Sequence, residues 1–400
     1  MPTFRASNLR PFVNLIGQMP PDPELAPFLA IFSSLEDPRR DHLKQHPLPD
    51  VLVLVVMGML AECENWVEIQ DFGLHRQEWF QSRGLFPCGM PSHDTLGRIF
   101  RALDSAVFAS LFASWVATVV EQVPGVVAID GKTSRASGDG KQAKPIHTVS
   151  AWSSETGLTL AHVPVQEKSN EITAIPEILD VLALKGCTVT IDAMGCQKNI
   201  AEHIRRRGGD YLLQVKANQS GTLDDIASFF DDADQRAWNG VEHTHCTAAN
   251  EGHGRREVRH AWACPIKGQW MDSHGWKDLR QIIRIRRERT LAGEASVENS
   301  YYISSDSRDA YHQLTCARQH WGIENRVHWV LDIAFNEDRS RVRKDHAGHN
   351  LITIRRFVLN LLRLEPSKKG IRRRRKMAGW DLDYLVRLLA LAAKPVSLGG

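Results

Sequence analysis

The sequence predicts an α/β protein in which a helical N-terminal domain precedes the sheet and a β-rich insertion interrupts it. Residues 1–124 carry helical spacing with no obvious strand, and residues 126–230 alternate short apolar runs with helical segments. Residues 236–305 are rich in His and Arg and hold strand-like pieces. A chain of 400 residues is also too long for one ordinary core. We therefore expect five stretches, with the insertion in the middle: 1–124, 125–235, 236–305, 306–365 and 366–400.

The N-terminal domain is expected to consist of helices. Pro47 precedes an apolar run at 51–61 that reads as a buried core helix, since it is too short to cross a bilayer. Ser92 is a plausible N-cap for a second helix, whose largely apolar face includes Leu96. That helix could be the recognition helix of a helix-turn-helix, but packing in the core of the domain is an equally good interpretation. A further helix is expected over 107–120.

The middle of the chain alternates strands and helices. Strands are expected at 126–129, 147–152, 158–165, 187–191 and 211–215, and helices at 170–184, 197–207 and 223–230. In the insertion, strands are expected at 257–264, 281–285 and 300–303. Helical spacing returns from Asp309 through Val330 and over 349–364, and a basic segment then separates these helices from a last one around 384–392.

The charge distribution points to a polyanionic partner. The whole chain has a net charge of only +3, but residues 339–376 hold 14 Lys and Arg against two acidic residues, a net charge of +12.

The 42% hydrophobic and 24% charged residues are normal for a soluble globular protein and rule out a disordered chain, a collagen or a small disulfide scaffold. The seven cysteines include no Cys-x-x-Cys pair, and the N-terminus lacks a signal pattern. We therefore expect a reduced, cytoplasmic protein with no membrane span.

Three carboxylates are candidates for a common site. Two buried-type strands end in an acid, Asp130 and Asp192, although either acid alone could simply cap a turn. Glu324 shares a helical stripe with apolar residues, where an unpaired charge would be costly to bury. Pairing with Arg318 or Arg326 at the surface is the competing interpretation of Glu324. Rival acids for the third position are Asp332 and, more weakly, Glu337 and Asp338.

These acids offer only hard oxygen ligands, which suit Mg²⁺ or Mn²⁺ and not zinc. A trio of carboxylates beside a basic surface suggests phosphoryl transfer on nucleic acid. Two ions roughly 4 Å apart can activate a water or a 3′-hydroxyl and stabilise the leaving oxygen. Because the three acids lie far apart in sequence, the fold must bring them together.

Several stretches, taken in order, resemble the DDE transposases of bacterial insertion sequences, in the H-repeat-associated protein branch. They span roughly residues 25–365, and so many ordered motifs are more specific than any single one. The stretches are PSHDTLGRIF (91–100), AIDGKTSR (128–135), QEKSNEITAIPEIL (166–179), VTIDAMGCQ (189–197), DYLLQVKANQ (210–219), EGHGRREVR (251–259), HWGIENRVHWVLDIAFNEDRSRVR (320–343) and NLITIRRFVLNLLR (350–363).

The resemblance implies an RNase H-like fold, with Asp130 on the first strand, Asp192 on the fourth and Glu324 on a helix beside them. It favours Glu324 over Asp332 as the third acid, and it implies two metal ions, double-stranded DNA as partner and a homodimer on DNA. The implied activity is metal-dependent cleavage at the element's ends and strand transfer into target DNA. Related transposases that form hairpins carry Tyr-x2-Arg-x3-Glu-x6-Lys. That pattern is missing here, so no hairpin mechanism is carried over; the corresponding positions are Ala317, His320 and Leu331.

Positively charged and imidazole side chains near these motifs and in the basic tract are predicted to contact DNA. They are Lys132, Arg135, Lys168, Lys216, His253, Arg255, Arg326, Arg339, Arg341, Arg343, Arg372, Arg373, Arg374 and Arg375. Glu171 could neighbour the metals, but an acid that starts a helix is the favoured interpretation. Candidates for stacking on a displaced base are Trp262, Trp270 and Trp276. The His and Cys residues between 243 and 264 match no common zinc spacing.

The leading hypothesis is therefore a transposase that uses Asp130, Asp192 and Glu324 as metal ligands. One alternative is an inactive DNA-binding remnant of a transposable element. The other is an RNase H-like nuclease that cuts DNA without transferring a strand.

Overall fold

The computed structural model describes residues 23–120, 123, 125–138, 144–165, 171–252, 255–266, 274–291 and 294–395. Three residues singled out in the sequence lie outside these ranges: Lys168, His253 and Trp270. The backbone of Arg255 is described but its side chain is not.

The centre of the molecule is a mixed sheet with strand order β3-β2-β1-β4-β5-β9-β8-β7-β6. Strand β1 pairs antiparallel with β2 and parallel with β4, and β5 continues the sheet parallel to β4. This arrangement of the first five strands confirms the expected RNase H-like fold. Their bounds are β1 Val126–Ser134, β2 Ile146–Ser153, β3 Thr159–Val165, β4 Thr188–Ile191 and β5 Asp210–Val215.

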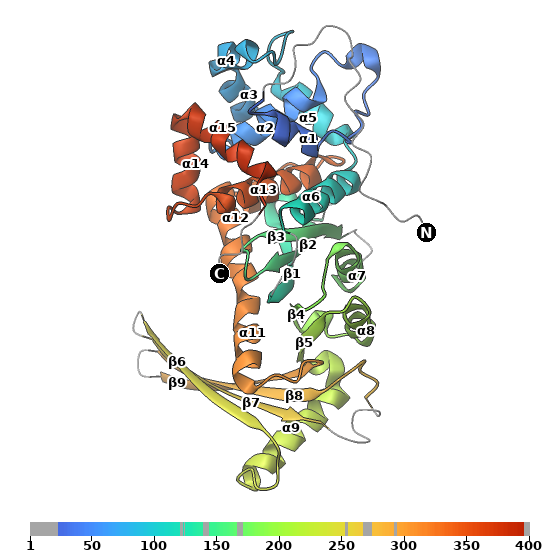
Figure 1. Cartoon of the computed structure of the whole chain (residues 1–400), viewed down its shortest axis with the longest axis vertical. Helices are drawn as coiled ribbons and strands as arrows, with labels where there is room; N and C mark the ends of the chain where they lie inside the picture. The colour runs from blue at the N-terminus through green and yellow to red at the C-terminus, as the bar shows by residue number, and fades with distance from the viewer. Residues whose placement is uncertain are drawn as a thin grey trace.

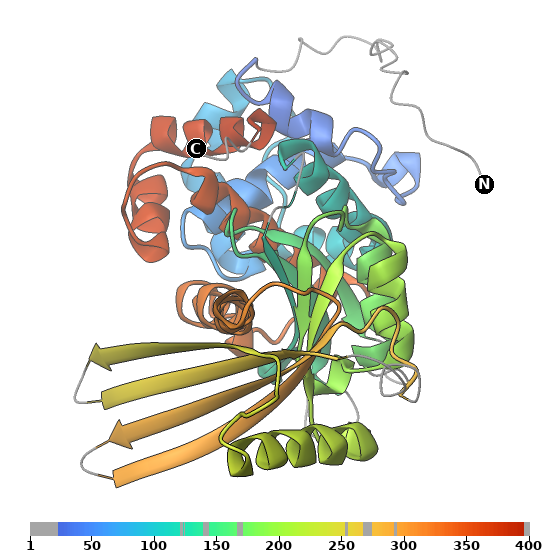
Figure 2. The same cartoon turned by 60° about the horizontal axis from the view of Figure 1, so that its bottom comes forward.

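The insertion does not form a sheet of its own, because β9 pairs antiparallel with β5 and continues the central sheet. Its long strands project beyond the helices, as Figures 1 and 2 show. They are β6 Thr244–Gly252, β7 Arg255–Pro265, β8 Gln281–Leu291 and β9 Glu294–Ser304. Strand β6 was not predicted. It is the edge strand and most of its residues are exposed, so its sequence lacks the apolar alternation by which strands are recognised.

Helices cover both faces of the central sheet (Figure 2). Helices α7 (Glu171–Val181) and α8 (Lys198–Arg206) lie on one face, and α11 (Ala310–Ile323) lies on the other, against β1 and β4. Helix α9 (Ser220–Gln235) packs beside β9. A π-helical turn, η5 (Glu324–His328), joins α11 to α12 (Trp329–Phe335).

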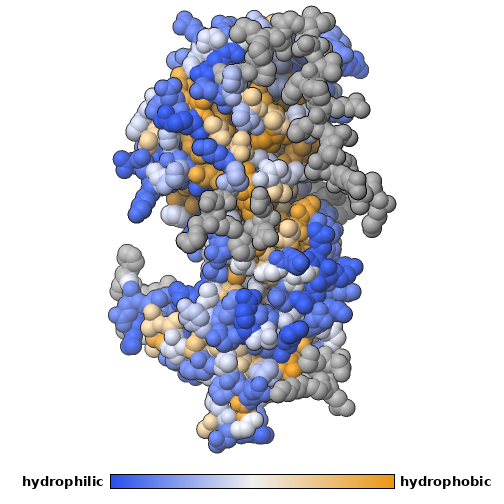
Figure 3. All heavy atoms as spheres, in the orientation of Figure 1, coloured by the Kyte–Doolittle hydropathy of each residue, from blue (hydrophilic) through white to orange (hydrophobic). Residues whose placement is uncertain are grey.

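The helices from the two ends of the chain pack together above the sheet (Figure 1). We call this set the helical body. On the face shown in Figure 3, hydrophobic residues show mainly among these helices, whereas the lower half is mostly hydrophilic. The body comprises α1 Ala26–Ile31, α2 Leu48–Leu60, α3 Trp66–His75, α4 Gln77–Ser82, α5 His93–Ala102, α6 Ser105–Val119, α13 Ala347–Leu364, α14 Ile371–Trp380 and α15 Leu382–Ala390.

Buried polar side chains join the two halves of the helical body. The amide of Asn350 on α13 donates to the carbonyls of Phe100 and Leu103 at the end of α5, both at 2.8 Å. These bonds satisfy carbonyls that the end of a helix leaves without partners. Among the described residues no single helix is long and apolar enough to cross a membrane, and α5 with α6, which meet at 86°, pass that test only when taken together.

The basic segment expected between the last helices is itself helical, because residues 371–380 form helix α14. Arg375 is fully buried, and its guanidinium donates to the Met59 carbonyl at 2.7 and 3.0 Å and to Glu64 at 2.9 Å. It also donates to the Ala334 carbonyl and lies over the Phe335 ring. The predicted DNA contact of Arg375 is therefore corrected to a structural role.

Arg374, its neighbour, is also buried. Its guanidinium donates to the carbonyls of Leu362 and Ser367 and pairs with Glu365. Its predicted DNA contact is corrected for the same reason: the side chain binds the end of α13 and the loop after it. Arg372 and Arg373, by contrast, are exposed on the outer side of α14.

We expect Arg375→Ala to lower the free energy of unfolding by about 3 kcal/mol or more, because it leaves two buried carbonyls and Glu64 without their partner. The exposed neighbour provides a matched control, and Arg373→Ala should change stability by less than about 0.5 kcal/mol. Urea unfolding of the three proteins measures both values. Equal stabilities for the two variants would contradict the role given to Arg375.

Candidate active site

The parallel pairing of β1 with β4 places two acids side by side. The register pairs Ile129 with Ile191, so Asp130 and Asp192 are the next residues on neighbouring strands. Adjacent strands lie roughly 4.8 Å apart. The Asp192 carboxylate accepts from the backbone N–H groups of Met194 and Gly195 at 3.1 and 3.3 Å. Asp192 thus caps a turn, as one interpretation held, and also lies beside Asp130.

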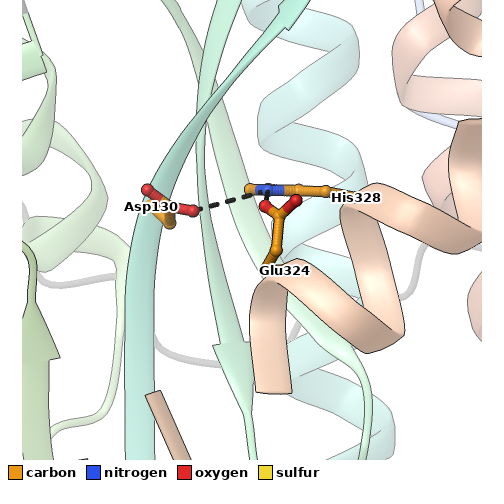
Figure 4. Close-up of side chains that lie close together, drawn as sticks. All are labelled: Asp130, Glu324 and His328. Carbon is orange, nitrogen blue, oxygen red and sulfur yellow. Dashed lines mark hydrogen bonds and ion pairs between the residues drawn. The ribbon is translucent and has the colours of Figure 1, made fainter. Parts of the chain in front are cut away.

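Glu324 reaches the same place from the helix on the α11 face (Figure 4). Its Oε2 lies 3.0 Å from Nδ1 of His328, and that nitrogen lies 3.4 Å from Oδ2 of Asp130. One ligand atom from each of these three residues lies within 4.8 Å of the other two. Among the described residues they are the one set of His, Cys, Asp or Glu side chains whose ligand atoms converge in this way.

A glycine lets α11 end close to the sheet. A Cβ at Gly322 would lie 2.4 Å from the indole ring of Trp152 on β2. Such a distance is far inside van der Waals contact, so a side chain at this position would push the end of α11 away. The close approach brings the following turn, which carries Glu324, within reach of Asp130.

The predicted apolar stripe around Glu324 is wrong. The Trp321 side chain is 61% exposed and that of Glu324 is 56% exposed, whereas the residues buried here are Ile323, Val327 and Leu331. The buried stripe passes through Ile323 and not through Trp321 and Glu324, so Glu324 is not a charge buried in the core. The competing interpretation also fails, since Glu324 makes no ion pair with Arg318 or Arg326 in the described part of the chain.

The rival acids are neutralised by other residues. Lys132 Nζ lies 2.7 and 2.8 Å from the two oxygens of Asp332 and 3.6 Å from Asp338. Glu337 is fully buried and pairs with Arg356 at 3.4 Å. These acids therefore have cationic partners, and Glu324 is the acid that approaches Asp130.

Burial raises the pKa of Asp130 to about 7, and the charges of Asp192, Glu171 and Glu324 act in the same direction, against a hydrogen bond from the Gly131 N–H that lowers it. Acids placed so closely either hold protons or share a cation. The donor set of carboxylate oxygens fits a hard divalent ion, and a raised pKa in such a cluster is typical of a functional site.

A fourth carboxylate lies on the opposite face of β1. Glu171, the first residue of α7, is 2.7 Å from Nε2 of His147, whose Nδ1 is 2.8 Å from the Thr133 hydroxyl. A Cβ at Gly131 would be 2.2 Å from the Glu171 carboxylate, so the glycine after Asp130 permits this contact. Glu171 both starts a helix, as favoured from the sequence, and contributes to the field at Asp130.

The predicted DNA contacts separate into three groups. Lys132 is only 7% exposed and is held by Asp332, so its predicted phosphate contact is corrected, like those of Arg374 and Arg375. Lys168, His253 and the Arg255 side chain lie outside the described residues. The exposed members are Arg135, Lys216, Arg326, Arg339, Arg341, Arg343, Arg372 and Arg373.

The described tryptophan candidates do not offer a free ring. Trp276 is buried, and Trp262 is half-buried between the Trp238 ring, stacked at 5.7 Å, and the Arg284 guanidinium at 4.3 Å. The site residue that the sequence analysis missed is His328. The available signal was its spacing, four residues after Glu324 on one helix, which brings two side chains together.

The strand order, with one acid within β1, one directly after β4 and a third after α11, defines an enzyme of the RNase H-like class. Residues 29–116 match the DDE_Tnp_1-associated family, and residues 121–361 match the transposase DDE domain family. The chain belongs to the transposase DDE domain family and is a DDE transposase, which confirms the resemblance seen in the sequence.

Its relatives include bacterial proteins of similar length. YncI of Escherichia coli O157:H7 is 38% identical over 369 residues, covering 90% of this chain and 94% of YncI. The H repeat-associated protein YhhI of Escherichia coli (strain K12) is 36% identical over 375 residues, covering 92% of this chain and 98% of YhhI. Among solved structures, the piggyBac transposase synaptic complex with hairpin DNA aligns with a TM-score of 0.42 and 11% identity, over 92% of this chain and 77% of that chain.

Metal binding at this site should weaken as the pH falls. The pKa of Asp130, raised to about 7 without metal, means that the carboxyl is mostly protonated at pH 6 and mostly ionised at pH 8. Because a divalent ion must displace that proton, we expect Mn²⁺ affinity to be about tenfold weaker at pH 6 than at pH 8. Isothermal titration at the two pH values measures this, and equal affinities would contradict the raised pKa.

Proposed function

We propose that this transposase cleaves DNA at the ends of an insertion sequence and joins those ends to target DNA, using two divalent ions, Mg²⁺ or Mn²⁺. The observation that supports this most directly is the approach of Glu324 to Asp130, beside the strand that ends in Asp192. Asp130 and Glu324 come from distant parts of the chain and approach each other, Asp192 follows the neighbouring strand, and none of the three has a Lys or Arg partner in the described residues. The negative charges of these carboxylates are therefore available to bind cations.

In this proposal Asp130, Asp192 and Glu324 hold the ions, and Asp130 is the acid that both approaches Glu324 and lies beside Asp192. Divalent ions bound there would activate a water or a 3′-hydroxyl and stabilise the leaving oxygen of the phosphodiester. The half-buried position of Asp130 limits the water around it, which strengthens its interaction with a cation. His328, itself buried, borders the site on the side of Glu324.

We also propose that the exposed basic residues bind the DNA backbone. Arg135 follows β1, where its guanidinium lies 3.4 Å from Asp338 and is largely exposed. Arg339, Arg341 and Arg343 follow in the segment after α12, and all three are exposed. Contacts of this kind position the duplex without reading its sequence, and they should weaken with added salt. A homodimer on paired DNA ends, as the resemblance implies, belongs to the same proposal.

Replacing Asp192 with Ala should abolish DNA cleavage, with a loss of roughly 10³-fold or more, while binding to the element's ends remains. The assay uses labelled DNA carrying the gene's own flanking sequences, with Mg²⁺ or Mn²⁺. Asp224→Ala, which removes an exposed acid on α9, is the matched control and should cut like the wild type.

Two other outcomes would sink parts of the proposal. Tight, salt-sensitive binding without cutting by either the wild type or the variant would indicate an inactive DNA-binding remnant. Cutting by the wild type without any joined strands among the products would indicate a nuclease that lacks strand transfer.

A further inference from the structure

His328 lies between Asp130 and Glu324, and its side chain is much more buried than that of Glu324. Its side chain is 4% exposed, whereas that of Glu324 is 56% exposed. Nδ1 of His328 faces Glu324 Oε2 at 3.0 Å and Asp130 Oδ2 at 3.4 Å, as Figure 4 shows. A buried, packed ring thus touches the end of a long side chain that could otherwise move in solvent.

The π-helical turn accounts for this placement. Ile323, Val327 and Leu331 are buried at intervals of four residues, a spacing that drifts around an ordinary α-helix. The wider turn at 324–328 offsets the drift, so these residues all stay in the core. Glu324 directly follows Ile323 and His328 directly follows Val327, and both side chains then face Asp130. Single π-turns of this kind recur at functional sites.

We propose that His328 is a positioning residue that holds the Glu324 carboxylate toward Asp130 and is not itself a metal ligand. This inference rests on the proposed function, in which Glu324 binds a divalent ion.

The hydrogen-bonding environment of the ring supports this role. Nε2 of His328 is buried and has no hydrogen-bond partner among the described residues, so the ring proton belongs on Nδ1, where the Glu324 carboxylate can accept it. A nitrogen that donates to a carboxylate has no lone pair to offer a cation. Mg²⁺ also prefers oxygen ligands, which the acids supply.

The energetic benefit is entropic. Fixing a long glutamate side chain in one place costs free energy because the side chain loses rotamer freedom. A histidine already fixed by packing can hold the carboxylate before the ion arrives. The ion then does not have to order this side chain when it binds. Residues that orient a metal ligand typically change metal affinity by about 10- to 100-fold when they are removed.

The test measures Mn²⁺ affinity by isothermal titration of the full chain. His328→Leu removes the donor and should weaken binding by about 10- to 100-fold. His328→Asn keeps an N–H donor near the place of Nδ1 and should restore part of the loss. In a Glu324→Gln background, His328→Leu should cause little further loss, because the two residues act through one contact.

His203→Leu is the matched control. His203 on α8 makes a similar contact, 2.7 Å from the Asp180 carboxylate, and its removal should leave Mn²⁺ affinity unchanged. Pulsed EPR of Mn²⁺ bound to the wild type gives a readout that needs no variant, and it should show no directly bonded imidazole nitrogen.

A directly bonded nitrogen would make His328 a ligand and overturn the inference. An unchanged affinity in a folded His328→Leu protein would overturn it as well. If the wild type binds no Mn²⁺ at all, the proposed function falls together with this inference. If binding depends on Asp130 and Glu324 but not on His328, only the inference falls.

Discussion

Two carboxylates side by side on neighbouring parallel strands are the constraint around which this structure is arranged. The register of β1 with β4 makes Asp130 and Asp192 adjacent, and their like charges oppose each other in a half-buried place. Such a pair is tolerated only where surrounding structure holds the strands together. The strands gain that support from α7 and α8 on one face and from α11 on the other.

The acids around the site fall into two groups, those that pair with a Lys or Arg side chain and those that do not. Lys132 binds Asp332 and Asp338, and Arg356 binds Glu337, although all these residues lie close to the site in sequence or in space. Of the acids around the site, Asp130, Asp192 and Glu324 are left without a Lys or Arg partner among the described residues. The position of each basic residue therefore helps to decide which carboxylates remain free for a metal, as much as the position of the acids does.

The sequence was informative where a signal is local. Apolar runs that end in Asp130 and Asp192 predicted β1 and β4, and a turn between two alternating segments predicted β2 and β3. The central strands and the class of enzyme could thus be read in advance. Glu324 was identified for a reason that does not hold, since it is exposed, but the resemblance to known transposases pointed to the same residue.

The features that the sequence did not predict depend on contacts with residues far away in the chain. Nothing near Lys132 shows that its ammonium is bound by an acid 200 residues later. The same holds for Arg375, whose acceptor at Met59 is 316 residues away, so a run of four arginines looked uniform although two face inward. Strand β6 carries no apolar alternation, and the π-turn that brings His328 to Glu324 has no sequence signature.

The buried contact of Arg375 with Met59 also constrains the order of events during synthesis. Helix α2 is almost wholly apolar, yet the side chain that binds its last turn is made 316 residues later. At roughly 5–20 residues per second, about 16–63 s separate the two on the ribosome. Through that interval the first helices lack their partners α13 and α14. The helical body can therefore close only after α14 has emerged, and until then the apolar surface of α2 has to be kept from aggregating.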